Sequence, residues 1–178
     1  MTRGIILYGP PAAGKDTITR HLEALHNRYV LFPRLKAGRG RTTGYRITTL
    51  ADIEALRRQD GIIWENHRYG ATYVLDRPGL TARLAEHVPV LHLGQVEGVH
   101  AVTTAIPDTR WVIVHVWCPR GVAEIRIRER GTGDTAERLK AWDETKPITD
   151  MADLTINTLV TSPGDAARQI DSYVNTVG

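Results

Sequence analysis

The stretch Leu7–Thr17, LYGPPAAGKDT, decides how the rest of the chain is interpreted. From Gly9 to Lys15 it has the frame Gly-x-x-x-x-Gly-Lys, the pattern of a phosphate-binding loop. The apolar run GIILY at 4–8 predicts a buried strand before the loop, and the amphipathic stretch DTITRHLEALHN at 16–27 predicts a helix after it. Such a motif requires a strand, the loop and a helix in this order, so we predict a nucleotide phosphate site here.

The loop supplies the chemistry that a nucleotide phosphate needs. Backbone N–H groups of such a loop, and of the helix that follows, point at phosphate oxygens, and glycines let the backbone come close. The Lys15 ammonium is expected to reach the β- and γ-phosphates of ATP as a point charge. The expected ATP-binding residues of the loop are Gly9, Pro10, Ala12, Ala13, Gly14, Lys15, Asp16 and Thr17.

The position after Lys15 departs from the common pattern, which has Ser or Thr there. This chain has Asp16, and the hydroxyl comes one residue later, at Thr17. The loop resembles that of nucleoside-monophosphate kinases and their relatives, which often carry Gly or Asp before the hydroxyl residue. This resemblance implies that Thr17 is the oxygen near the phosphates and the Mg²⁺ ion. Two interpretations of Asp16 stay open: it holds Mg²⁺ through water, or its charge only favours the helix N-terminus.

The composition is that of a globular protein. Of 178 residues, 42% are hydrophobic and 24% are charged, which suits a single domain spanning 1–178. No apolar run approaches the roughly 20 residues that cross a bilayer. The single cysteine, Cys118, excludes an internal disulfide and is expected to be a small buried apolar residue. We therefore expect a cytoplasmic protein, monomeric or homodimeric, that does not bind membranes.

The net charge of +3 reflects a basic excess that is concentrated in RLKAGRGR, Arg34–Arg41. Three interpretations of this segment are open: a site for an anionic ligand, a solvated loop, and an RNA-binding tract. We carry the first forward and expect a small-molecule partner and no nucleic acid.

Strand and helix patterns alternate along most of the chain. Beyond the first strand, apolar runs predict strands at 28–32, 88–94, 110–119 and 152–158. Helices are predicted at 50–61, 77–87, 121–131, 135–144 and 162–177. This alternation predicts an α/β fold with a mostly parallel sheet covered on both faces. The segment 34–75 departs from it, and its second half, IIWENHRYGATYVL at 62–75, predicts short strands or a loop.

Several stretches resemble one enzyme superfamily, in the order in which that superfamily carries them. The loop GPPAAGKDT resembles that of nucleoside-monophosphate kinases. The stretch WCPRGVAEIRIRERGTGD at 117–134 resembles the strand, helix and lid of guanylate kinases, and RYGATY at 68–73 resembles their Tyr-Gly element. The chain also resembles the ribose 1,5-bisphosphate phosphokinases of the same superfamily. The resemblance implies a P-loop kinase fold with a parallel core sheet, an inserted acceptor-binding subdomain at about 34–75 and a mobile lid at about 126–138.

The resemblance also implies roles for individual residues. Lys15 would hold the transferring phosphate, and the catalytic lid or core arginines would be Arg126, Arg130 and Arg138. Asn157 would lie near the adenine of ATP. The acceptor would be bound by Arg34, either Arg39 or Arg41, Tyr45 and Tyr69 at its phosphate, and by Glu65 at its base.

The acceptor region departs from the guanylate kinases in two places. Their serine-rich acceptor stretch reads VLFPRLKAG at 30–38 in this chain. The aspartate pair that follows their third core strand is absent, with His92 and Gly94 at about those places and Glu97 soon after. The ribose 1,5-bisphosphate phosphokinases also lack this pair. The resemblance therefore supports ATP as the donor and leaves the acceptor base unassigned.

The function that these observations predict is transfer of the γ-phosphoryl group from Mg-ATP to a small phosphorylated acceptor, such as a nucleoside monophosphate or ribose phosphate. Two alternatives are a phosphotransferase for a non-phosphorylated hydroxyl compound, such as a nucleoside or antibiotic, and a non-catalytic guanylate kinase-like binding module. A GTPase is a weaker alternative. DRPG at 76–79 matches the pattern D-x-x-G, but the chain has no N-K-x-D motif, and we expect Asp76 to cap the helix that follows.

Overall fold

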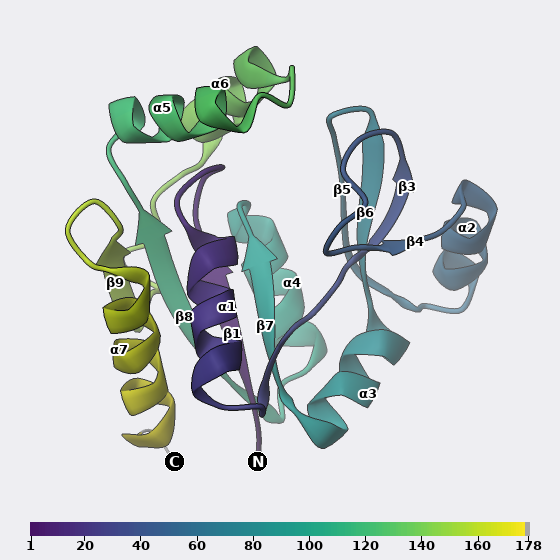
Figure 1. Cartoon of the computed structure of the whole chain (residues 1–178). Helices are drawn as coiled ribbons and strands as arrows, with labels where there is room; N and C mark the ends of the chain where they lie inside the picture. Colours follow the sequence, from purple (N-terminus) through teal and green to yellow (C-terminus); the bar gives the residue numbers. More distant parts are fainter. Residues whose placement is uncertain (177–178) are drawn as a thin grey trace.

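The computed structural model describes residues 1–176, and its core is a five-stranded parallel sheet (Figure 1). Its strands, in order across the sheet, are β2 (Tyr29–Leu31), β7 (Val88–Leu93), β1 (Thr2–Tyr8), β8 (Thr109–Trp117) and β9 (Leu154–Asn157). Every neighbouring pair runs parallel. In the middle of the sheet Ile5 lies between Val90 and Val112, as expected for strands that are buried on both faces.

Four helices cover the two faces of this sheet: α1 (Lys15–Leu25) and α7 (Pro163–Thr176) on one, α3 (Arg77–Glu86) and α4 (Val96–Ala105) on the other. Successive residues of β1 point to opposite faces. Leu7 therefore packs in the cluster that contains Ile18 of α1, and Ile6 packs in the cluster that contains Leu80 of α3. The predicted α/β fold with a covered parallel sheet is confirmed.

A second, four-stranded sheet is inserted between β2 and α3. Its strands, in order, are β4 (Arg46–Ile47), β3 (Leu35–Gly38), β6 (Ala71–Asp76) and β5 (Ile62–Arg68). Helix α2 (Leu50–Arg58) packs on it through Ile53, which is buried against Ala37 and Val74. The sheet lies within the segment 34–75 that departs from the strand–helix alternation, and Figure 1 shows it facing the core across the carboxyl ends of the core strands.

Two short helices, α5 (Arg120–Arg130) and α6 (Thr135–Glu144), lie beyond the carboxyl ends of β1 and β8 (Figure 1). They pack around Cys118 and Ile127, and Cys118 is fully buried among apolar neighbours, as predicted. The connection between them contains Gly131 and Gly133, both with positive φ. The mobility of a lid at about 126–138 stays a prediction.

The segment 62–75 is more regular than predicted. Its two strands form an antiparallel hairpin whose turn is Tyr69-Gly70, with φ of 54° and 69°. Positive φ at both turn residues matches the right-handed twist of paired strands and makes a tight hairpin. Both faces of β5 are half-buried, so polar and apolar residues do not alternate clearly along it. For this reason the sequence did not show a clear strand pattern there.

Helix α4 and strands β3 and β4 were not predicted. Helix α4 has the sequence VEGVHAVTTA, whose β-branched residues and glycine have low helix propensity. Packing of Val99 and Val102 against the core sheet overrides that propensity. Strand β3 occupies part of the Arg-rich segment 34–41, for which a solvated loop was one open interpretation. Lys36 and Ala37 are buried there because β3 pairs with β6.

Asp76 caps α3 as predicted, accepting a hydrogen bond from the Gly79 backbone N–H at 2.9 Å. Across residues 1–176 no helix has the length and apolarity to cross a membrane. Residues 177–178, which the predicted last helix and domain included, lie outside the described residues.

Candidate active site

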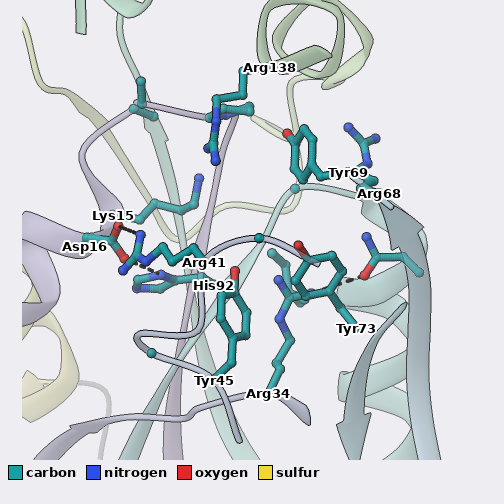
Figure 2. A pocket seen from close by; sticks show the side chains of 18 of the residues that line it. Lys15, Asp16, Arg34, Arg41, Tyr45, Arg68, Tyr69, Tyr73, His92 and Arg138 are labelled. Carbon is teal, nitrogen blue, oxygen red and sulfur yellow. Dashed lines mark hydrogen bonds and ion pairs between the residues drawn. The ribbon is translucent and has the colours of Figure 1, made fainter. Parts of the chain in front are cut away.

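A cavity of about 410 Å³ opens where the carboxyl ends of β1 and β7 face the second sheet. Most of its lining comes from three parts of the chain: the phosphate loop at 9–16, the second sheet with its loops, and the connection between α5 and α6. Figure 2 shows the charged and aromatic side chains that point into it.

The phosphate loop depends on its two glycines. A Cβ atom on Gly9 would lie 1.9 Å from the Val116 carbonyl oxygen, so no side chain fits there. Gly14 has a φ of 106°, which L side chains rarely adopt, and α1 begins at the next residue. No described residue accepts a hydrogen bond from the backbone N–H groups of Gly14, Lys15 and Asp16. These donors at the helix N-terminus are therefore available to an anion.

Lys15 lies inside this loop and has only neutral partners. Its ammonium donates to the carbonyl oxygens of Gly9 at 2.6 Å and Pro10 at 2.7 Å. Burial, reinforced by the charges of Arg34 and Arg130, lowers the pKa of Lys15 to about 8. A bound phosphate would supply the opposite charge that this ammonium lacks.

A polar cluster joins α1 to the end of β7. Asp16 Oδ2 accepts a hydrogen bond from Arg41 at 3.2 Å, and Asp16 Oδ1 lies 3.5 Å from His92 Nδ1. His92 Nε2 lies 2.7 Å from the Thr19 hydroxyl. Burial, with the nearby positive charge of Lys15 and despite the charge of Asp16, lowers the pKa of His92 to about 3, so the ring is neutral near pH 7.

The opposite wall of the cavity is built from tyrosines and an arginine. The hydroxyls of Tyr45, Tyr69 and Tyr73 point into the same space (Figure 2). Arg34 donates to Asn66 Oδ1 at 3.3 Å, and its guanidinium lies 5.3 Å from the centre of the Tyr73 ring. Burial raises the pKa of Tyr73 to about 12, so its hydroxyl stays a neutral hydrogen-bond donor.

Lys36 supports this wall from below. Only 1% of its surface is exposed, and its ammonium donates to the Arg41 carbonyl oxygen at 2.7 Å. The same ammonium lies 5.7 Å from the ring centres of both Tyr45 and Tyr73. Lys36 therefore fixes the loop that carries Arg41 against the second sheet.

Arginines from the α5–α6 region complete the cavity. Arg130 and Arg138 both line it. The Arg138 guanidinium lies 5.1 Å from the centre of the Tyr69 ring and donates to Asp134 Oδ1 at 2.7 Å. This contact joins the α5–α6 region to the hairpin turn of the second sheet across the mouth of the cavity.

The lining carries an excess of four positive charges. Its cationic residues are Lys15, Arg34, Arg39, Arg41, Arg68, Arg130 and Arg138, and its acidic residues are Asp16, Asp134 and Glu137. A concave surface with one sign of charge concentrates ligands of the opposite sign. The cavity therefore favours an anionic ligand.

Most of the predicted site residues line this cavity. They are Gly9, Ala12, Ala13, Gly14, Lys15, Asp16, Arg34, Arg39, Arg41, Tyr45, Tyr69, Arg130 and Arg138. The phosphate loop at 9–16, the inserted sheet with its loops and the segment 130–138 are thus brought together. Their individual roles stay predictions.

The structure places Glu65 outside the cavity lining, and its predicted role at the acceptor base stays a prediction. Alternate residues of β5, Trp64, Asn66 and Arg68, line the cavity, so Glu65 lies on the opposite face of the strand. There its carboxylate accepts from Arg57 of α2 at 2.8 Å.

Arg126 also lies outside the cavity lining. Its guanidinium donates to the carbonyl oxygen of Ala12 at 3.1 Å, and to the hydroxyl at 3.0 Å and the carbonyl oxygen at 3.1 Å of Thr158. With these three hydrogen bonds it holds the phosphate loop against the segment after β9. In this structure Arg126 positions the loop, and its predicted contact with the phosphates stays a prediction.

Three other predicted nucleotide contacts fall outside the lining. Thr17 is partly buried, and its hydroxyl accepts from Arg20 at 3.5 Å. Asn157 uses its side-chain oxygen to accept from the Leu159 backbone N–H at 3.0 Å. The carbonyl oxygen of Pro10 accepts a hydrogen bond from Lys15, but Pro10 is not part of the cavity lining. The next residue, Pro11, lines the cavity.

Sequence reasoning missed Tyr73, Asn66 and Arg68 as cavity residues. The signal that reveals them is the alternation of side chains between the two faces of β5 and β6. That alternation can be assigned to a face only when the hairpin turn is known to lie at Tyr69. In the described part of the chain, no three His, Cys, Asp or Glu side chains gather as a possible metal site. Any metal bound here would need ligands from the nucleotide as well.

Solved structures share this arrangement of elements. The crystal structure of guanylate kinase from Anaplasma phagocytophilum is 16% identical, with 98% of this chain and 86% of that chain covered and a TM-score of 0.68. The chain has a P-loop kinase fold. A shikimate kinase from Acinetobacter baumannii, in complex with shikimate, is 19% identical, with 99% and 94% covered and a TM-score of 0.54. The resemblance to nucleoside-monophosphate kinases is thus confirmed at the level of the fold.

No family model and no curated protein matches the chain by sequence. At identities this low, the structural likeness establishes the P-loop kinase fold and leaves the reaction to be argued from the cavity itself.

Proposed function

We propose that this protein is an ATP-dependent kinase that transfers the γ-phosphoryl group to a small phosphorylated acceptor, such as a nucleoside monophosphate or ribose phosphate. The observation that carries the proposal is the pairing of two anion sites in one cavity. Lys15 and the N-terminus of α1 form one, and Arg34 with the tyrosine hydroxyls forms the other. A donor phosphate and an acceptor phosphate in one cavity suit phosphoryl transfer between them.

On the donor side, the free backbone N–H groups of the loop and the Lys15 ammonium would hold the phosphates of ATP. Asp16 and His92 lie beside the loop and offer one oxygen and one nitrogen to a divalent cation. When bound, Mg²⁺ or a similar ion neutralises charge on the phosphate oxygens. The donor set fits such an ion only together with phosphate oxygens and water.

On the acceptor side, the guanidinium of Arg34 and the hydroxyls of Tyr45, Tyr69 and Tyr73 would bind the phosphate that the acceptor already carries. Arg130 and Arg138 reach the cavity from the α5–α6 region, where they would stabilise the charge of the transferring group and exclude water. Catalysis would then consist of positioning and electrostatic stabilisation, and no covalent intermediate is needed.

The test of this proposal is ADP release across a panel of acceptors. Nucleoside monophosphates, pentose phosphates, their dephosphorylated forms and small carboxylates would be compared at one ATP concentration. Acceptor-dependent ADP release with a phosphorylated compound supports the proposal. ATP binding without turnover of any acceptor would favour a non-catalytic binding module, and turnover of only neutral compounds would favour the alternative phosphotransferase.

The lowered pKa of Lys15 leads to a prediction for nucleotide binding. Its pKa is about 8 in the free protein and returns toward its ordinary value of 10.5 once phosphate lies beside the ammonium. Between these two values the complex binds more protons than the free protein, so ADP binding at pH 8.5 is expected to take up a proton. Calorimetry in buffers of different ionisation enthalpy measures this uptake.

The matched control for proton uptake is Lys15→Met, which removes the titrating group and keeps a side chain of similar length. Its residual ADP binding should proceed without uptake linked to this group. Equal proton uptake by the wild type and the variant would show that Lys15 is not the responsible group.

The proposal includes a cytoplasmic location and a monomer or homodimer that binds small molecules only. The buried, single Cys118 is compatible with a reducing compartment. Cell fractionation and light scattering are the corresponding measurements.

A further inference from the structure

The loop 39–45 connects β3 to β4 and forms one side of the cavity. It contains no helix or strand residue, and residues 39–43 are exposed. Its two glycines, Gly40 and Gly44, have φ of 88° and 84°, a conformation that other residues adopt less readily. The position of this loop, and of the Tyr45 side chain that points into the cavity, therefore depends on contacts with its surroundings.

Arg41 supplies such contacts in two directions. Its carbonyl oxygen accepts from the buried ammonium of Lys36 in β3 at 2.7 Å, and its Nε donates to the Thr43 carbonyl oxygen at 3.0 Å. Its Nη1 donates to Asp16 Oδ2 at 3.2 Å (Figure 2). Arg41 therefore links the second sheet to the first turn of α1, directly beside the phosphate loop.

Asp16 depends on the same contact. Its other oxygen lies beside His92, which is neutral near pH 7, so Arg41 is the only charged side chain in residues 1–176 that forms an ion pair with it. A carboxylate next to an anion site repels phosphate oxygens. The guanidinium of Arg41 offsets this repulsion, so the acid can be accommodated at the start of α1.

We propose that Asp16 is a positioning residue for the acceptor: through Arg41 it holds the loop 39–45 against the phosphate loop. This role gives a use to an acid at the position where the common motif has Ser or Thr, and it requires neither a metal contact nor a helix charge. The inference rests on the proposed function, because it assigns this loop to acceptor binding. It also predicts that, once Arg41 is removed, the unpaired Asp16 repels the phosphates of the donor.

The test is a double-mutant cycle of Asp16→Asn, Arg41→Met and the double variant, with the phosphorylated acceptor of the panel that gives the highest turnover. Each single variant should raise KM for this acceptor by about fivefold to tenfold with little change in kcat, and the double variant should be no worse than Arg41→Met. ADP binding should weaken by about threefold in Arg41→Met only, and the double variant should restore it. Asp108→Asn, which removes an exposed carboxylate before β8, is the control and should leave all these values unchanged.

Amide hydrogen exchange of the segment 39–45 provides a readout that needs no turnover. Exchange should be faster in Asp16→Asn than in the wild type and unchanged in Asp108→Asn. If Asp16→Asn does not fold, Asp16→Ser, which restores the common motif, replaces it.

Two results would overturn the inference on Asp16. One is a further loss of acceptor use when Asp16→Asn is added to Arg41→Met. The other is a higher Mg²⁺ requirement caused by Asp16→Asn with and without Arg41, which would make Asp16 a metal residue. Unchanged exchange of 39–45 in Asp16→Asn, in an active enzyme, contradicts the inference alone. Faster exchange in a protein that turns over no acceptor supports the link between loop and helix and contradicts the proposed kinase.

Discussion

Lys15→Ala is expected to lower the rate of phosphoryl transfer by about 100-fold or more, because a preorganised charge at the transferring group contributes that much to the rate. Lys15 donates only to two backbone carbonyl oxygens in this structure, so no other side chain loses its partner in the variant. The variant should therefore stay folded. ADP release at saturating acceptor measures the rate, and circular dichroism with thermal melting measures the fold.

The matched control is Lys140→Ala, which removes the same charge from α6, where the side chain is 78% exposed. That variant should keep wild-type turnover. Near-normal turnover of Lys15→Ala, in a folded protein, would show that the loop at 9–16 is not the donor site. Lys15→Met removes the charge but fills about the same space as lysine. If Lys15→Ala unfolds, the turnover of a folded Lys15→Met variant measures the contribution of the charge alone.

The core of this fold was predictable because its signals are local. GIILY at 4–8 is apolar throughout, as expected for a strand that is buried on both faces. The loop needs glycines where a Cβ atom would clash with the backbone, so its pattern can be recognised in the sequence. Most loop residues expected near a nucleotide do line the cavity. The likeness of GPPAAGKDT to one kinase superfamily extended this local signal to the whole chain.

The inserted sheet was harder to predict because its pattern depends on partners far away in sequence. Whether Glu65 or Asn66 faces the cavity is set by the register of β5 against β6, and a shift of one residue exchanges the two faces. In the sequence, Tyr73 cannot be distinguished from other residues of a strand. Its place in the cavity becomes evident only from its packing against Tyr45 in the structure. Arg126 could be recognised as a support of the loop only from its contact with Ala12, which lies 114 residues away in the sequence.

Phosphorylated acceptors are expected to be used far better than their dephosphorylated forms. Arg34, Arg41 and Arg68 bring like charges to one side of the cavity. Arg41 pairs with Asp16 and Arg68 lies 3.8 Å from Glu144, whereas Arg34 donates only to the neutral side chain of Asn66. A phosphate on the acceptor relieves the mutual repulsion of these charges, whereas a neutral compound leaves it in place. Comparing kcat/KM for each compound with its dephosphorylated form measures the difference, and efficient use of an unphosphorylated nucleoside or sugar would contradict it.

Arg34→Ala should lower kcat/KM for the acceptor by about 10- to 100-fold, because an arginine–phosphate contact contributes about 1–3 kcal/mol. The affinity for ATP should change little. Arg34→Lys keeps the charge without the planar guanidinium, so its kcat/KM for the acceptor should lie between those of the wild type and Arg34→Ala. Arg58→Ala, at the exposed end of α2, is the control. An equal loss of ATP affinity in Arg34→Ala would place Arg34 at the donor phosphates instead.

The lack of a carboxylate at the acceptor wall predicts that GMP will not exceed the other phosphorylated acceptors by a wide margin in kcat/KM. Guanine presents ring N–H and amino donors, for which a carboxylate is the matching acceptor. In the described chain Glu65 faces away from the cavity and pairs with Arg57. His92 and Gly94 stand at about the places where guanylate kinases carry an aspartate pair. Under the proposed function, the acceptor wall would bind the phosphate and would offer guanine no carboxylate from the second sheet. Phosphorylation of GMP with a kcat/KM far above that of every other phosphorylated acceptor would show that this wall recognises guanine by other groups.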